Sequence, residues 1–361
     1  MTAHQTHRIL QESRPDGTLI LTAPDPDTVD GPLLPAILET QARENGGQPF
    51  LIEPAPATPQ ILTFAEAHAR ATDLGRAFRG FGLSPDRPLA ILSQNSITHA
   101  LVSLGAMIAG VPVAPISVAY STMPDKGRLR DVLQTLQPGL VFAEDGNAFA
   151  DALTLAATLK FTTLVDRNAG SGADYPTLDT FCETHGGDDI PMPVVQADTL
   201  AKIQFTSGST GGPKGAMVTH GMMASNQRAM AAVWPFLSDT PPVLVDWLPW
   251  NHTYGGNLVF NCALFNGGTL VIDNGRPAPG LFDETVDNLR NHPPVVHFGV
   301  PRGFAMLVPK LEADAAFART YFSRLRAMFT AGAALPRDLW DRYRQLARQY
   351  GRPDLQVHIG W

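Results

Sequence analysis

Short apolar segments alternate with helical segments along most of this chain, and this alternation limits its possible folds more than any other feature. In the first half, four segments have the character of strands: 88–93, 111–116, 139–143 and 161–166. Helices are expected between them at three segments: 95–110, 125–136 and 148–159. Alternation with short connections is typical of a parallel sheet covered by helices.

The same pattern resumes after a break at 167–198, which is rich in Gly, Pro and Asp and is expected to be a connecting segment. Strands are then expected at 200–206, 242–248, 269–272, 295–298, 326–330 and 355–359. A chain of 361 residues is also longer than one compact core usually holds. We therefore expect an α/β fold with two parallel-sheet subdomains and helices packed on both faces.

The expected division of the chain follows these two runs. Residues 1–62 are expected to form an N-terminal arm and a first helix, residues 63–198 the first α/β subdomain, and residues 199–361 the second. Two local signals support the helix boundaries. Thr63 and Glu66 have capping-box spacing. Asn95 is expected to cap the helix at 95–110.

Charge and cysteine content exclude several classes of function. The net charge of −7 argues against a nucleic-acid surface. The two cysteines, Cys182 and Cys262, provide neither a metal-binding spacing nor a disulfide framework, which favours a reducing, cytoplasmic compartment. The longest apolar stretch, 100–116, is interrupted by Gly and Pro, so it predicts a buried helix followed by a strand and no membrane span. The oligomeric state is not indicated.

The strongest chemical signal is the segment Thr206-Ser-Gly-Ser-Thr-Gly-Gly-Pro-Lys-Gly215, between an expected strand and a helix that begins near Thr219. Its glycines leave backbone N–H groups free to face an anion. Hydroxyl groups add hydrogen-bond donors, and Lys214 adds a positive charge. The segment is expected to bind a polyphosphate through a set of eight residues: Thr206, Ser207, Gly208, Ser209, Thr210, Gly211, Gly212 and Lys214.

Two other interpretations of this segment are a Walker loop and a flexible linker. A Walker loop requires Gly before its Lys and Ser or Thr after it, whereas Pro213 precedes Lys214 and Gly215 follows it. A flexible Ser/Gly linker would not end in Pro-Lys-Gly between a strand and a helix. Phosphate binding is therefore favoured over both.

Three segments together resemble the adenylate-forming, AMP-binding superfamily, which includes acyl-CoA synthetases. They are the phosphate loop, Asp246-Trp-Leu-Pro-Trp-Asn-His-Thr-Tyr-Gly-Gly-Asn257, and Phe329-Thr-Ala-Gly-Ala-Ala-Leu-Pro336. The resemblance implies ATP-dependent conversion of a carboxylic acid to its acyl-adenylate and then to a coenzyme A thioester. It implies ATP, Mg²⁺ and coenzyme A as cofactors, and a small carboxylic acid as the other partner.

The resemblance also implies roles for individual residues. His252, Lys214 and Thr206 would act at the reacting groups, with Lys214 on the ATP phosphates. The acid pocket would be formed by His252, Tyr254, Gly255 and Val300. The adenine would lie against Gly332, Ala333 and Ala334. No metal-ligating residue is assigned. Each residue also has a plainer explanation, such as a buried histidine for His252 or a strand-to-helix turn for Gly332.

Within the superfamily the chain is similar to feruloyl-CoA synthases, in the Trp-Leu-Pro-Trp-Asn-His segment and in Ala90-Ile-Leu-Ser-Gln-Asn-Ser96. This similarity implies a hydroxycinnamate substrate such as ferulate. A Tyr254 wall could stack on a flat ring and offer its hydroxyl to a phenol. Medium-chain fatty acids and other aryl acids remain alternatives.

One departure from the superfamily concerns the end of the sequence. Superfamily members continue with a Gly-x-Thr-Glu segment and a C-terminal lid with a catalytic lysine, whereas this sequence ends at Gly360-Trp361. The resemblance therefore implies a C-terminally truncated ligase with little thioester-forming activity. Two rival functions stay open: an acid–AMP ligase that acylates a carrier protein, and a non-catalytic fragment that binds nucleotide or acid.

Overall fold

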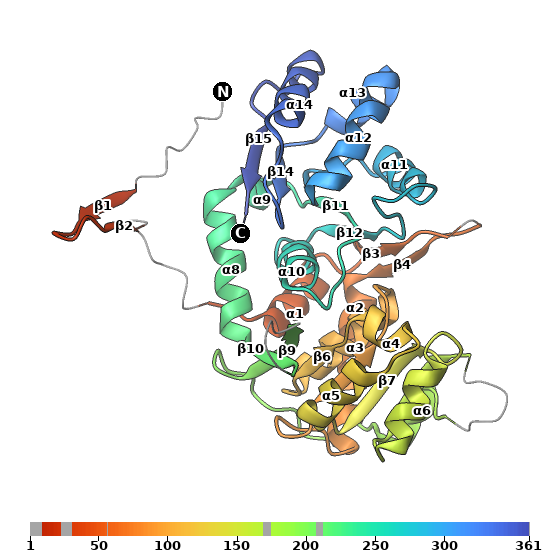
Figure 1. Cartoon of the computed structure of the whole chain (residues 1–361). Helices are drawn as coiled ribbons and strands as arrows, with labels where there is room; N and C mark the ends of the chain where they lie inside the picture. The colour runs from red at the N-terminus through yellow and green to blue at the C-terminus, as the bar shows by residue number, and fades with distance from the viewer. Residues whose placement is uncertain (1–8, 23–30, 56, 169–174, 207–211, 361) are drawn as a thin grey trace.

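The computed structural model describes residues 9–22, 31–55, 57–168, 175–206 and 212–360. The strands of these residues form sheets of six, four, three and two strands (Figure 1). Helices cover the three larger sheets, and the chain is therefore a mixed α/β protein with largely parallel sheets, as the alternation predicts.

The six-stranded sheet has the order β10-β9-β6-β5-β7-β8. Its strands are β5 (Leu89–Leu92), β6 (Val113–Pro115), β7 (Leu140–Asp145), β8 (Thr163–Arg167), β9 (Leu200–Thr206) and β10 (Lys214–Thr219). All neighbours pair in parallel except β9 and β10, which form an antiparallel hairpin at one edge. The connecting helices are α3 (Ile97–Ile108), α4 (Val118–Thr122), α5 (Gly127–Leu136) and α6 (Ala150–Thr158).

The four-stranded sheet has the order β11-β12-β3-β4, from β11 (Val243–Asp246), β12 (Thr269–Ile272), β3 (Pro49–Glu53) and β4 (Gln60–Thr63). The parallel three-stranded sheet consists of β13 (Val296–Gly299), β14 (Ala327–Thr330) and β15 (Gln356–Ile359). The two sheets adjoin, because the Val295 N–H donates to the Val243 carbonyl over 3.0 Å. An exposed hairpin of β1 (Leu10–Ser13) and β2 (Leu19–Thr22) precedes them.

The other helices of the described chain are α1 (Leu34–Glu44), α2 (Phe64–Gly80), α7 (Leu178–His185), α8 (His220–Val233), α9 (Phe236–Asp239), the π-helix η1 (Tyr254–Val259), α10 (Phe260–Phe265), α11 (Phe282–Asn291), α12 (Pro301–Ala313), α13 (Ala315–Phe322) and α14 (Arg337–Gln349). None of the helices described is long and apolar enough to cross a membrane.

Side-chain alternation shows that the six- and four-stranded sheets are buried on both faces. In β5, Leu89 and Ile91 belong to the central core while Ala90 and Leu92 face α5 and α6. In β12, Leu270 faces the central core and Val271 faces α11–α14. The central core, which contains α1, α2, α3 and α10, therefore lies between the two sheet systems (Figure 1).

Two glycines allow α2 and α3 to pack unusually close together in this central layer. A Cβ atom on Gly75 would lie 2.8 Å from the Gly105 carbonyl oxygen, and one on Gly105 would lie 2.8 Å from the Ala71 carbonyl oxygen. Any larger residue would force the helices apart. This close contact lies in the central core, next to β5 and β6.

Several sequence expectations are confirmed at residue level. The capping box of Thr63 and Glu66 is present. The apolar stretch 100–116 is a buried helix followed by a strand.

Other expectations were wrong. Ser96, not Asn95, caps α3, by accepting a hydrogen bond from the His99 N–H. The segment 167–198 contains α7, which Phe181 holds against α2. The helix after the phosphate loop begins near Thr219 as expected, but a strand, β10, lies between the loop and α8, because the chain after the loop pairs back on β9.

The sheets do not follow the expected division at residues 62 and 198. Strands β3 and β4, from the N-terminal part, complete the sheet of β11 and β12. The hairpin of β9 and β10 completes the sheet of the first subdomain. Hydrogen bonding to an existing sheet edge satisfies the backbone of both pairs, whichever run of the sequence they come from.

The buried histidines give a first prediction, on stability against pH. Burial lowers the pKa of His99, His220 and His297 from 6.5 to about 4. Between these pH values the unfolded chain binds more protons than the folded chain, so the free energy of unfolding should fall on acidification. The expected slope is about 1.4 kcal/mol per pH unit for each histidine.

Urea unfolding at about pH 7, 6 and 5 measures this slope. His297→Gln provides the control, because it removes one titrating group that does not line the cavity described below. Its slope should be smaller by about 1.4 kcal/mol per pH unit, the contribution of one histidine. Equal slopes for the variant and the parent chain would contradict the assignment of His297.

Candidate functional site

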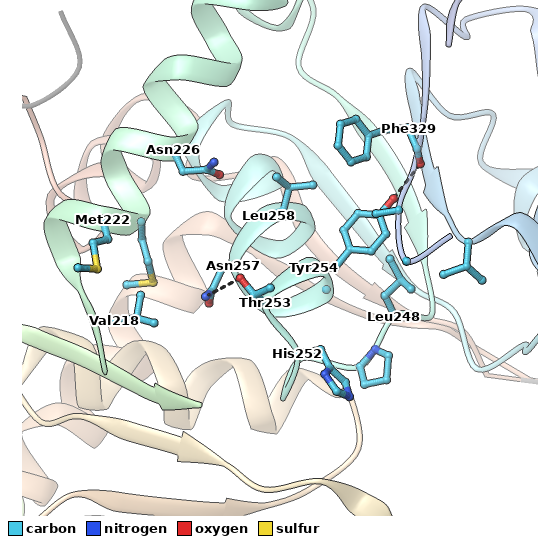
Figure 2. A pocket seen from close by; sticks show the side chains of 16 residues that line it. Val218, Met222, Asn226, Leu248, His252, Thr253, Tyr254, Asn257, Leu258 and Phe329 are labelled. Carbon is cyan, nitrogen blue, oxygen red and sulfur yellow. Dashed lines mark hydrogen bonds between the residues drawn. The ribbon is translucent and has the colours of Figure 1, made fainter. Parts of the chain in front are cut away.

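A cavity of about 720 Å³ lies between α8, the segment after β11, and the ends of β13 and β14. Figure 2 shows α8 side chains on one side and Tyr254 and Phe329 on the opposite side. Its lining consists of Val218, Met222, Met223, Asn226, Leu248, Pro249, His252, Thr253, Tyr254, Gly255, Asn257, Leu258, Val300, Phe329, Ala331 and Gly332. The structure thus brings together five residues predicted for the acid and adenine sites: His252, Tyr254, Gly255, Val300 and Gly332.

The wall of this cavity depends on a tight reversal of the chain between β11 and η1. A Cβ atom on Gly255 would lie 2.4 Å from the Leu248 carbonyl oxygen. A Cβ atom on Gly256 would lie 2.2 Å from the Trp250 carbonyl oxygen. Because these neighbours are backbone atoms that cannot move aside cheaply, only glycine is compatible with either position.

Asn95 anchors the same segment from the first sheet. Its side-chain amide donates to the Leu248 carbonyl over 2.9 Å, and its side-chain oxygen accepts the Trp250 N–H over 3.0 Å. This pair of bonds explains why Asn95 is not the cap of α3. It fixes the position from which His252 reaches the cavity.

His252 lies at the junction of two cavities. Its side chain is exposed, and its backbone N–H donates to the Pro249 carbonyl over 3.1 Å. It lines the first cavity and also a second one of about 500 Å³, which contains Trp247, Asp273 and Arg276 in its wall. A group held at His252 is therefore accessible from two sides.

Tyr254 forms a clamp between the ends of β13 and β14. Its hydroxyl lies 2.8 Å from the Phe329 carbonyl oxygen and 3.1 Å from the Gly299 carbonyl oxygen, and it accepts the Gly299 N–H over 3.0 Å (Figure 2). The expectation that this hydroxyl serves a substrate phenol is not supported, because backbone groups occupy it. The Tyr254 ring remains a wall of the cavity.

The predicted adenine loop only partly reaches the cavity. Ala331 and Gly332 line it, and Gly332 has a positive φ of 86° that favours glycine. Ala333 and Ala334 are exposed and are not part of the lining. Phe329, the residue that begins the motif, contributes its ring instead.

The phosphate segment forms the end of the β9–β10 hairpin. Thr206 and Lys214 are paired across the two strands at the base of the loop, and both are exposed. Gly212 is exposed too, with open space where a Cβ would be. The predicted residues Ser207, Gly208, Ser209, Thr210 and Gly211 lie outside the described residues. Neither Thr206 nor Lys214 is in the lining of the first cavity.

The first cavity has uncharged walls. Its lining contains no Asp, Glu, Lys or Arg among the described residues, so a carboxylate would meet no fixed charge of its own sign. Apolar side chains of α8 and η1, including Met222, Met223 and Leu258, line one end. The described part of the chain contains no group of three or more His, Cys, Asp or Glu arranged for a metal ion.

Ionisable groups are buried behind these walls. Burial lowers the pKa of Lys202 to about 7 and raises the pKa of Asp246 well above its usual range. Lys202 donates to the Gly256 carbonyl over 2.8 Å. Lys202 thus supports the backbone of the site from outside the cavity.

Sequence reasoning missed several residues of the cavity wall, among them Met222, Met223, Asn226 and Leu258. They come from the first turns of α8 and from the continuation of the His252 segment into η1. The sequence did contain a signal for the α8 residues, because α8 starts directly after the phosphate hairpin, with Thr219 as its N-cap. Trp250 is buried and lines the second cavity.

Comparison with protein families gives a match to the model described as AMP-binding enzyme, over residues 38–360. The long-chain-fatty-acid–CoA ligase of Salmonella typhimurium is 34% identical over 322 residues, which cover 81% of this chain and 54% of the relative. The sulfoacetate–CoA ligase of Cupriavidus necator is 28% identical over 249 residues, covering 69% of this chain and 46% of the relative. The chain thus spans about half the length of these curated relatives.

Solved structures show the same fold. A long-chain-fatty-acid–CoA ligase from Archaeoglobus fulgidus superposes with a TM-score of 0.73 at 19% identity, covering 91% of this chain and 64% of the other. ATP-bound MatB from Rhodopseudomonas palustris superposes with a TM-score of 0.68 at 22% identity, covering 86% of this chain and 57% of the other. At these identities the likeness is one of fold.

The Tyr254 clamp gives a second prediction. Tyr254→Phe keeps the ring in the wall but removes the hydroxyl that joins β13, β14 and η1. The expected loss of unfolding free energy is about 1–3 kcal/mol, because the buried Gly299 N–H and Phe329 carbonyl lose their partner. Urea unfolding measures it, with Tyr350→Phe as the matched control, since that hydroxyl makes one long, exposed contact of 3.5 Å. Equal stability of the two variants would show that the clamp contributes nothing.

Proposed function

Because this chain belongs to the AMP-binding enzyme family, we propose that it carries the acid- and ATP-binding part of an acid–CoA ligase that forms an acyl-adenylate. The observation that supports this proposal is the cavity at His252. An apolar end between α8 and η1 can accept the body of an acid, Gly332 borders the opposite side, and no fixed charge repels a carboxylate. Activity of the whole protein, including thioester formation, is part of the proposal.

The chemistry follows from the poor leaving group of a carboxylate. A carboxylate oxygen attacks the α-phosphorus of ATP, a new C–O–P bond forms, and the bond to the β-phosphate oxygen breaks with release of pyrophosphate. In this scheme His252 orients the carboxylate, Thr206 and Lys214 bind the phosphates, and Gly332, Ala333 and Ala334 border the adenine. Mg²⁺ would accompany the triphosphate and neutralise part of its charge.

The thiol acceptor requires its own approach to the adenylate. His252 lines both cavities, so a thiol could reach the activated carbonyl through the second cavity while the acid occupies the first. Arg276 in the second wall suits an anionic acceptor such as coenzyme A. A carrier-protein thiol is the alternative, and the acceptor preference distinguishes the two. A cytoplasmic location is proposed from the two free cysteines.

For the acid we propose a hydroxycinnamate such as ferulate. The rings of Tyr254 and Phe329 are 5.9 Å apart and edge-on at one side of the cavity, where they can pack against a flat ring. The main alternative is a medium-chain fatty acid. It is favoured by the methionines of α8, by the apolar wall, and by the relatives whose names specify long-chain fatty acids. The second alternative is that this chain binds nucleotide and catalyses no reaction.

The third prediction concerns the phosphate lysine. Lys214→Ala should weaken ATP binding by about 1.5–3 kcal/mol, because a charge-assisted phosphate contact is lost. Calorimetric titration with Mg·ATP measures the change. Lys310→Ala is the control, since it removes a lysine whose described contact is Asp283, on an exposed helix surface. If the two variants bind ATP equally well, Lys214 is not part of the nucleotide site.

The fourth prediction concerns the acid. Ferulate and coumarate should bind in the presence of ATP more tightly than benzoate and octanoate, and should support faster ATP–pyrophosphate exchange. A preference for octanoate would replace the hydroxycinnamate with the fatty acid and leave the adenylation proposal intact. Binding of ATP without exchange for any acid would favour the nucleotide-binding alternative.

A further inference from the structure

Lys202 is a buried cation at the junction of the two halves of the proposed site. It lies in β9, four positions before Thr206 at the base of the phosphate loop. Lys202 is 4% exposed, and none of the ion pairs found among the described residues includes it. It borders only a space of about 10 Å³, next to His99, Trp250 and Phe260. Lys202 therefore cannot contact a substrate in either of the larger cavities.

Burying an ammonium group without a counter-charge is unfavourable, because the group loses its hydration. A methionine or leucine would fill the same space without this cost. The contact that the lysine gains is a single described hydrogen bond, from Nζ to the Gly256 carbonyl over 2.8 Å. The position of Gly256 gives this bond its significance.

Gly256 connects Lys202 directly to His252. Its carbonyl accepts from Lys202, and its N–H donates to the His252 carbonyl over 2.9 Å. The two bonds form a chain from the strand of the phosphate loop, through the first turn of η1, to the histidine between the cavities.

Gly256 also has little freedom to adjust. It packs so closely on Trp250 that a Cβ atom would lie 2.2 Å from the Trp250 carbonyl oxygen. Its backbone is thus held between Trp250 on one side and Lys202 on the other. Displacement of β9 would be transmitted to η1 through this bond, and the wall formed by Thr253, Tyr254 and Gly255 would move with it.

We propose that Lys202 is a positioning residue that fixes His252 and the η1 wall of the acid cavity relative to the phosphate hairpin. Through this link, the orientation of the acid depends on the strand that carries the phosphate loop. The inference rests on the proposed function for its effect on acid binding, while the link between Lys202 and His252 is structural and can be tested without any substrate.

The test uses Lys202→Met, which preserves the volume of the side chain and removes its donor. The melting temperature should change little, because the loss of the hydrogen bond to the Gly256 carbonyl is offset by the removal of a buried amine that has no counter-charge. The dissociation constant for ATP should change less than about twofold, whereas that for the acid should rise about tenfold or more, because the bond that holds Gly256 and the η1 wall is lost. Lys202→Gln, which retains a shorter donor, should show an intermediate effect and provides a second variant if the methionine variant does not fold.

A substrate-free measurement separates this inference from the proposed function. In the chain with labelled histidine, the His252 imidazole resonance is assigned by its loss in His252→Ala. Lys202→Met should shift or broaden this resonance. Tyr343→Phe, which removes a buried donor to the Phe304 carbonyl between α12 and α14, should not.

The possible outcomes are distinct. If neither ATP nor any acid binds the parent chain, the proposed function fails, while a shifted His252 resonance still supports the link. An unchanged His252 resonance in Lys202→Met, or equal weakening of ATP and acid binding, would overturn the positioning role.

Discussion

The packing of Gly255 and Gly256 against the carbonyls of Leu248 and Trp250 is the constraint on which the site depends. It folds the chain back between β11 and η1 with no room for a side chain at the crossing. His252 therefore occupies the outside of the reversal, where both cavities reach it. Without this reversal the two cavities would have no common residue.

Hydrogen bonds to two different sheets hold the reversal in place. Asn95 follows β5 and bonds to Leu248 and Trp250, Lys202 in β9 bonds to Gly256, and Tyr254 bonds to the ends of β13 and β14. Each of these polar groups meets backbone atoms, which satisfies donors and acceptors that would otherwise be buried without partners. The short segment between β11 and η1 thus connects separate sheets. The geometry of the site depends on how these sheets lie relative to one another.

The sequence predicted the order of the elements well because periodicity is a local property. Strand and helix patterns and the capping box of Thr63 and Glu66 involve residues near one another in the chain. It predicted sheet membership poorly, because β3, β4, β9 and β10 join whichever sheet edge is available in space. For the same reason Asn95 was assigned to the nearest helix, although its partners lie about 150 residues further along the chain.

The site shows the same limit. Motifs identified His252, Tyr254, Gly255 and Gly332, since each lies in a characteristic local pattern, and all four line one cavity. The methionines of α8 have no such pattern and are recognisable as wall residues only once α8 is seen beside η1 (Figure 2). The hydroxyl of Tyr254 was assigned to the substrate, because its actual partners, Gly299 and Phe329, come from two distant strand ends.

Because the Tyr254 hydroxyl is hydrogen-bonded to the backbone, this cavity has fewer ways to distinguish one acid from another. A phenol and an alkyl chain differ mainly in shape and in one polar group, and discrimination by shape alone gives only modest factors. With Tyr254 committed to the backbone, strong selection for a phenol would need another polar group in the wall.

Asn226 and Asn257 supply amide groups beside the apolar side chains of α8 and η1. The amide of Asn257 already donates to the Gln204 side chain over 2.9 Å and its side-chain oxygen is buried, so the exposed Asn226 is the better placed of the two. Selectivity for a hydroxylated ring would therefore arise on the α8 side of the cavity, opposite the aromatic clamp.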